Sequence, residues 1–120
     1  MRHIITGGNG FTGKVLTRQL LERGEEVVHF DLHPAASPDV ALKVRQVIGG
    51  VRNLDDLRRL ELQSGNVVHH LAARQFADAV PRRGRDAWFE DVNVRGTQNV
   101  VHTMQEAGAH RLVFFSTDMT

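Results

Sequence analysis

The 120-residue sequence has no cysteine, no tyrosine and no long run of apolar residues. Without cysteine there are no disulfides, thiolate metal sites or cysteine nucleophiles, which is consistent with a cytoplasmic protein. No apolar run approaches the roughly 18 residues of a membrane span, and nothing at the N-terminus resembles a secretory signal. We therefore expect a single domain over residues 1–120 and no membrane partner.

An excess of charge of one sign is also missing, because the formal net charge is +1. So weak a field gives no argument for a nucleic-acid partner. The one basic cluster, at residues 82–85, is not accompanied by an array of exposed aromatic side chains and is most simply a solvated loop. We expect no binding of nucleic acid.

Three glycines spaced three apart, Gly7, Gly10 and Gly13, follow the apolar pair Ile4-Ile5. In a strand-to-helix turn around a diphosphate, the first glycine permits the sharp turn, the second lets N–H groups approach the phosphates, and the third allows close packing. Residues 12–23 are predicted to form the helix, with Gly24 after its end. Its predicted apolar face consists of Val15, Leu16, Leu20 and Leu21.

A carboxylate follows at the spacing that a dinucleotide site requires. Asp31 ends a second apolar strand and lies 18 residues beyond Gly13, near the roughly 20 expected for an acid that binds the adenosine ribose. A carboxylate there would repel a 2′-phosphate, and no arginine follows immediately. We predict NAD as the cofactor, with NADP less favoured.

A second nucleotide motif overlaps the first. Residues from Gly8 to Lys14 also satisfy the beginning of the P-loop pattern for nucleoside triphosphates. The next position must carry a hydroxyl that binds magnesium, and it is occupied by Val15. A P-loop phosphotransferase is therefore the third-ranked hypothesis.

Alternating strands and helices predict the architecture. Continuous apolar strands require a parallel sheet that is covered on both faces. Right-handed crossovers and the glycine-rich first turn select a doubly wound, Rossmann-like α/β sheet with strand order 3-2-1-4-5. Strands are expected at 2–6, 26–30, 44–48, 67–71 and 111–116; further helices are expected after Asn53, which can cap its helix, and over 86–107.

Two adjacent histidines, His69 and His70, lie in the fourth predicted strand. Neighbouring strand residues point to opposite faces, so the two side chains cannot chelate one metal ion together. Packed, hydrogen-bonded histidines are the simpler interpretation, and we expect no metal.

Several segments in the same order resemble the N-terminal, dinucleotide-binding part of extended short-chain dehydrogenases/reductases, the NAD-dependent epimerase/dehydratase family. This family mostly acts on nucleotide sugars, so the resemblance implies a small-molecule substrate that is a sugar derivative. The matching segments are Thr6–Gly13, Asp31, Gly49–Asn53, Val68–Ala73, Val92–Thr97 and Ser116-Thr117.

The resemblance also implies roles for individual residues. Gly7, Gly10 and Gly13, with the backbone of Phe11 and Thr12, would hold the pyrophosphate, and Asp31 would bind the ribose. Gly50 and Val51 would flank the adenine, although Gly50 stands where the family usually has an acid. Leu71, Ala72 and Ala73 would line the middle of the cofactor, and Asn93 would lie near the active site.

Two residues after the fifth strand are candidates for catalysis by the same resemblance. Thr117 is similar to the Ser or Thr that hydrogen-bonds the substrate, and Asp118 could supply an acid. Met119 stands where sugar 4,6-dehydratases have a base, and methionine cannot exchange protons. Epimerase or simple dehydrogenase chemistry is therefore favoured over dehydration.

The tyrosine and lysine with which the family assists hydride transfer are missing from this chain, as is its substrate lobe. The chain is thus expected to be the cofactor domain of a longer enzyme, truncated after the fifth strand. The alternative is a non-catalytic nucleotide-sensing or interaction module. An apolar fifth strand at the sheet edge further predicts poor solubility or association of copies, and we expect a homo-oligomer.

Overall fold

The computed structural model describes residues 1–8, 10–34, 42–71 and 91–114. The first half contains β1 (Arg2–Thr6), α1 (Phe11–Glu22), β2 (Glu26–Asp31) and β3 (Arg45–Ile48). The second half contains α3 (Leu54–Arg58), β4 (Val67–His70), the π-helical turn η1 (Asp91–Arg95), α5 (Gly96–Ala107) and β5 (Arg111–Phe114).

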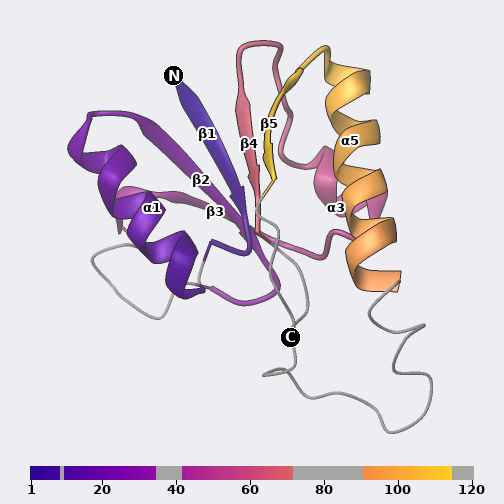
Figure 1. Cartoon of the computed structure of the whole chain (residues 1–120), viewed down its shortest axis with the longest axis horizontal. Coiled ribbons are helices and arrows are strands. Elements are labelled where there is room, and N and C mark those ends of the chain that lie inside the picture. Colours follow the sequence, from indigo (N-terminus) through magenta and orange to yellow (C-terminus); the bar gives the residue numbers. More distant parts are fainter. Residues whose placement is uncertain (9, 35–41, 72–90, 115–120) are drawn as a thin grey trace, which may run out of the picture.

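All strands are parallel and lie in the order β3-β2-β1-β4-β5, which confirms the predicted doubly wound, Rossmann-like α/β fold. The chain runs outward from β1 to β3 and then crosses to β4, so consecutive crossovers place helices on both faces. Figure 1 shows α1 and α5 on opposite sides of the sheet.

Each face of the sheet has its own apolar core. Strand residues alternate between the faces, so Ile4 packs on the side of α3 and α5, whereas Ile5 packs on the side of α1. Leu57 and Met104 complete the first core, and Leu20 completes the second. In the described part of the chain, no helix has the length and apolar character needed to cross a membrane.

Two helices differ from the prediction. The helix after Asn53, which the spacing of Leu54, Leu57 and Leu60 predicts to continue to the turn at 64–66, ends at Arg58. Glu61 then adopts a positive φ of 51°, although Leu60 remains 1% exposed in the core. In the helix predicted over 86–107, residues 86–90 lie outside the described residues. Its described part starts with the π-helical turn η1, which is continuous with α5. Apolar spacing located both helices because it reports burial, but it carries no information about a local change in helix pitch.

The predicted apolar face of α1 is only partly correct. Leu20 is buried, but Val15 is 43% exposed. The buried face of α1 instead contains Gly13 and the polar residue Thr17, which is fully buried. The glycines Gly24 and Gly108 follow α1 and α5 with φ of 76° and 73°, as expected for residues that end helices in the left-handed conformation.

Among the described strands, β5 lies at one end of the sheet, and its four residues are exposed. Val113 is 41% exposed and Phe114 is 54% exposed. An exposed apolar edge strand can pair with a strand of another copy. Association of copies through β5 stays a prediction.

Asn53 caps the short helix α3 as predicted. Its Oδ1 accepts hydrogen bonds from the N–H groups of Asp55 (2.9 Å) and Asp56 (3.3 Å). We expect Asn53→Ala to lower the free energy of unfolding by about 1 kcal/mol, because the first-turn N–H groups lose their acceptor. Urea denaturation measures the change. Asn53→Ser retains a capping oxygen and should cost less; equal losses in both variants would contradict the capping role.

Candidate functional site

Four parallel strands bring most of the predicted site residues to one edge of the sheet. The glycine-rich turn follows β1, Asp31 ends β2, Gly50 and Val51 follow β3, and Leu71 follows β4. Because the strands are parallel, these positions all lie at the carboxyl edge, where doubly wound sheets bind their ligands. Ala72, Ala73, Thr117 and Asp118 lie outside the described residues.

The turn after β1 has the backbone geometry that its glycines permit. Gly7 has a φ of 72°, which is in the left-handed region that favours glycine. Its N–H donates to the carbonyl of Phe30 (2.8 Å), the residue before Asp31, and its own carbonyl accepts from Gly10 N–H (3.2 Å). The turn is therefore attached directly to the end of β2 that carries the predicted ribose-binding carboxylate.

The two sides of the turn approach each other so closely that side chains are excluded. A Cβ on Gly13 would lie 2.5 Å from the carbonyl oxygen of Gly8. A Cβ on Gly8 would lie 2.7 Å from ring atoms of His29. The third glycine thus has the close-packing role that its spacing predicts, and the loop fits the description of a backbone cradle for a diphosphate.

The first N–H groups of helix α1 follow directly after this turn. Its N-cap is Gly10, which has no side chain to accept their hydrogen bonds, and its first turn contains no acidic residue. Phe11 is 84% exposed and Thr12 is also exposed. The partial positive charge of the helix N-terminus is therefore uncompensated by a local carboxylate, which suits an anionic ligand.

Asp31 is held at the strand end by its backbone and is only partly buried. Its carbonyl accepts a hydrogen bond from Gly49 N–H (2.9 Å), which links β2 to the segment after β3. Its carboxylate lies 3.4 Å from the backbone nitrogen of His33. The residue before Asp31 is thus bonded to the glycine-rich turn through the backbone, and the ribose-binding role of the Asp31 carboxylate stays a prediction.

The segment after β3 contacts α3 and α5, on the face of the sheet opposite α1. Gly50 N–H donates to the carboxylate of Asp56 (3.1 Å), which sequence analysis did not anticipate. Val51 is buried, its carbonyl accepts from the Asn99 side chain (2.9 Å), and its Cγ2 would lie 2.6 Å from a Cβ on Gly96. Val51 therefore has a packing role beside the adenine contact predicted for it.

A directed hydrogen-bond network joins the ends of β1 and β4 to the segment of Asn93. The Thr97 hydroxyl donates to the Asn93 carbonyl (2.6 Å), so it must accept from His70 Nε2–H (3.1 Å). His70 Nδ1 (2.7 Å from Thr6 Oγ1) then accepts from the Thr6 hydroxyl, and that oxygen accepts from Leu71 N–H (3.1 Å). The network holds Leu71 and Asn93, both partly buried, in fixed positions.

Four histidines are buried, of which the sequence predicted two, His69 and His70, as packed residues. Burial lowers the pKa of His70 to about 4, and burial beside His3 lowers that of His69 to about 4. His69 stacks on His3, with His69 Nε2 at 2.9 Å from His3 Nδ1, on the opposite face of the sheet from His70. The packed interpretation of both histidines is confirmed, and the described residues contain no group of three metal-ligating side chains.

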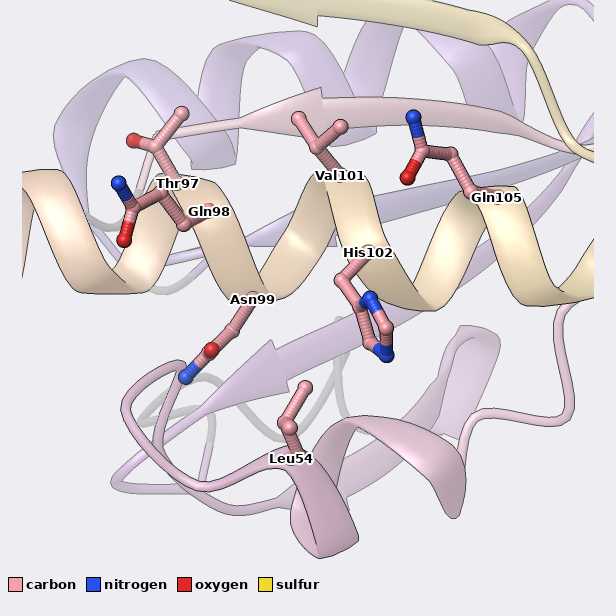
Figure 2. Close-up of a pocket in the computed structure, with 7 residues that line it drawn as sticks. All are labelled: Leu54, Thr97, Gln98, Asn99, Val101, His102 and Gln105. Atoms are coloured by element: carbon pink, nitrogen blue, oxygen red, sulfur yellow. The ribbon is translucent and has the colours of Figure 1, made fainter.

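A separate open groove of about 550 Å³ lies between α5 and the start of α3. Figure 2 shows Asn99 and His102 on the side of α5 that faces Leu54. None of the glycine-loop residues lines this groove. It therefore takes no part in the candidate cofactor site.

Fold and site together define a Rossmann-fold domain with a strand–turn–helix of the dinucleotide-binding type. The sequence matches the model of the NAD dependent epimerase/dehydratase family over residues 3–120. The chain belongs to this family, as the resemblance of its motifs predicted.

Individual relatives include both sugar and steroid enzymes. The chain is 35% identical to a 3-beta-hydroxysteroid dehydrogenase from Mycolicibacterium neoaurum, covering 98% of this chain and 32% of the relative. It is 32% identical to a UDP-glucose 4-epimerase from Streptomyces lividans, covering 99% and 36%. The structure of a Thermus thermophilus UDP-glucose 4-epimerase in complex with NAD superposes with a TM-score of 0.78 at 30% identity, covering 98% and 38%. The chain thus spans about a third of the length of these relatives.

Proposed function

We propose that this chain is the NAD-binding part of an epimerase or dehydrogenase that acts on a nucleotide sugar or a related sugar derivative. The observation that carries the proposal is the close approach of Gly8 and Gly13 in a turn that is hydrogen-bonded to Phe30, the residue before Asp31. The backbone of Gly7, Gly10, Phe11, Thr12 and Gly13 would hold the diphosphate, and the Asp31 carboxylate would accept hydrogen bonds from the adenosine ribose. When bound, NAD supplies a hydride acceptor.

The remaining predicted residues complete this proposal. Leu71, Ala72 and Ala73 would line the cofactor, and Asn93 would lie near the reaction centre, held through the carbonyl that accepts from Thr97. Thr117 and Asp118 are proposed to contact the substrate. The similarity to UDP-glucose 4-epimerases supports a sugar substrate, whereas the similarity to a hydroxysteroid dehydrogenase makes a sterol the competing substrate class.

A second candidate is a non-catalytic nucleotide-sensing or interaction module. Both candidates require NAD binding and differ in turnover. Incubation of the natural full-length protein with NAD and either UDP-glucose or a 3-hydroxysterol separates them, since only the enzyme converts a substrate.

Asp31 provides the direct test of the cofactor site. We expect the wild-type chain to bind NAD more tightly than NADP. We expect Asp31→Ala to lower NAD affinity about tenfold and to reduce the ratio of NAD affinity to NADP affinity. The reason is that the variant loses both an acceptor for the ribose and the repulsion of a 2′-phosphate. Isothermal titration calorimetry with NAD, NADP and ATP measures these affinities.

Asp55→Ala is the matched control for this test. Asp55 is an exposed carboxylate of α3 whose removal changes the net charge by the same amount. It should leave NAD and NADP binding unchanged. Preferential binding of ATP, or equal NAD affinity in wild type and Asp31→Ala, would refute the proposed site.

A further inference from the structure

A buried histidine lies directly beneath the glycine-rich turn. His29, in β2, is 1% exposed, and Thr17, in the second turn of α1, is fully buried. His29 Nε2 lies 2.7 Å from the Thr17 hydroxyl oxygen, and this hydroxyl donates to the Gly13 carbonyl (2.6 Å). The chain of contacts therefore runs from the centre of the sheet to the third glycine of the turn.

The direction of these hydrogen bonds follows from the number of protons. A threonine hydroxyl has one proton, and the Gly13 carbonyl can only accept it. The second contact of the hydroxyl must then be an acceptance from His29 Nε2–H. Burial lowers the pKa of His29, so the Nε2–H tautomer of a neutral imidazole satisfies the geometry at neutral pH.

The same imidazole also supports the other side of the turn. Its Cδ2 and Cγ atoms lie where a Cβ on Gly8 would approach within 2.7 Å, so the ring is in contact with the backbone of Gly8. Gly8 in turn leaves no space for a side chain on Gly13. The imidazole of His29 thus fixes the position of the Gly8 backbone by direct packing. It fixes the position of the Gly13 carbonyl through the Thr17 hydroxyl.

We propose that His29 is a positioning residue for the diphosphate cradle, acting on Gly8 by packing and on Gly13 through the Thr17 hydroxyl. The proposal rests on the proposed function and deepens it. A cradle that is held from below presents its N–H groups without reorganisation when two linked phosphates arrive. His29 should therefore favour ligands that contain a diphosphate and should be indifferent to the nucleoside alone.

Three variants separate the two parts of this role. His29→Phe keeps a ring beneath Gly8 but has no N–H, Thr17→Val keeps the shape of Thr17 but has no hydroxyl, and Thr17→Ser retains the hydroxyl. We expect the first two to bind NAD about tenfold more weakly, the effect of one lost hydrogen bond, and to bind adenosine within twofold of wild type. Thr17→Ser should recover NAD affinity to within about threefold.

Calorimetry with NAD and nuclear magnetic resonance titration with adenosine measure the two affinities, after circular dichroism has verified folding. The matched control is Thr103→Val in α5. Thr103 is 5% exposed and its hydroxyl donates to the Asn99 carbonyl (2.8 Å), the same local bond, and no histidine of the described residues is seen to hydrogen-bond this hydroxyl. Thr103→Val should change neither affinity.

Each outcome has a defined meaning. Wild-type affinity for NAD in His29→Phe and Thr17→Val, or equal losses for NAD and adenosine, would overturn the positioning role while leaving the proposed function intact. A wild-type chain that binds no NAD would overturn the proposed function, and this proposal with it. If His29→Phe does not fold, amide hydrogen exchange at Gly8 and Gly13 in Thr17→Val decides: exchange as slow as in Thr103→Val refutes the role.

Discussion

Gly13→Ala is expected to reduce NAD affinity by more than about 100-fold and the free energy of unfolding by about 2–3 kcal/mol. The new Cβ would lie 2.5 Å from the carbonyl oxygen of Gly8 and 2.7 Å from its carbonyl carbon and Cα. These are backbone atoms, so no rotamer change relieves the overlap. The two sides of the turn must separate, which dismantles the proposed cradle. Calorimetry with NAD and urea denaturation measure the two losses.

Two further glycines distinguish packing from ligand approach. A Cβ on Gly65 meets nothing within 4 Å, so Gly65→Ala should leave NAD affinity unchanged and alter stability by less than about 0.5 kcal/mol. Among the described residues, a Cβ on Gly10 meets only the Gly7 carbonyl, at 3.6 Å. Gly10→Ala should therefore fold normally and still bind NAD more weakly, because the added methyl group lies on the exposed side of the turn. Normal NAD binding by Gly13→Ala would contradict the cradle.

The sequence predicted the architecture because its strongest signals are physical requirements of that architecture. Five apolar strands separated by crossovers allow few topologies, and the observed strand order is the predicted one. Gly13 was predicted to allow close packing of helix and strand, and a Cβ there would lie 2.5 Å from the carbonyl oxygen of Gly8 in the turn. The glycine-rich turn and the carboxylate at the end of the next strand could be predicted because each depends on residues that are close together in the sequence.

The polar interior could not be predicted in the same way. Thr17 was outside the predicted apolar face of α1, yet it is fully buried because a histidine from β2 and a carbonyl of its own helix satisfy its hydroxyl. Such burial depends on a partner 12 residues away, which no periodicity reveals. A polar residue between apolar ones in the strand, as at His29, is the signal that could have suggested it.

The same interior gives the domain its second measurable property, which is sensitivity to mild acid. His3, His29, His69 and His70 are buried, and burial lowers the pKa of each below the ordinary value of 6.5. For His69 and His70 the folded-state pKa is about 4. Below pH 6.5 the unfolded chain therefore binds protons that the folded chain does not, and stability falls as the pH falls toward 4.

We expect the free energy of unfolding to be constant above about pH 7 and to decrease between pH 6.5 and 4.5 by several kcal/mol, with His69 and His70 contributing about 2 kcal/mol or more each. The two described carboxylates with a lowered pKa do not account for this window. Glu25 and Glu106 have a pKa lowered from 4.5, by hydrogen bonds with the N-terminal amine and Arg58 respectively, so their contributions are lost only at lower pH. Urea denaturation at pH 7.0, 6.0, 5.0 and 4.5 measures the profile.

Single substitutions assign the slope to buried histidines. His69→Phe preserves a ring that can stack on His3 and removes one buried imidazole, so its stability should fall less steeply between pH 6.5 and 4.5. His102→Gln removes a histidine that is more than half exposed in α5 and should keep the wild-type slope. A profile that is flat from pH 7 to pH 4.5 would show that these imidazoles are protonated without loss of the fold. The network that joins Thr6, His70 and Thr97 would then have to tolerate a second proton on His70, whose Nδ1 accepts from Thr6 in the neutral state.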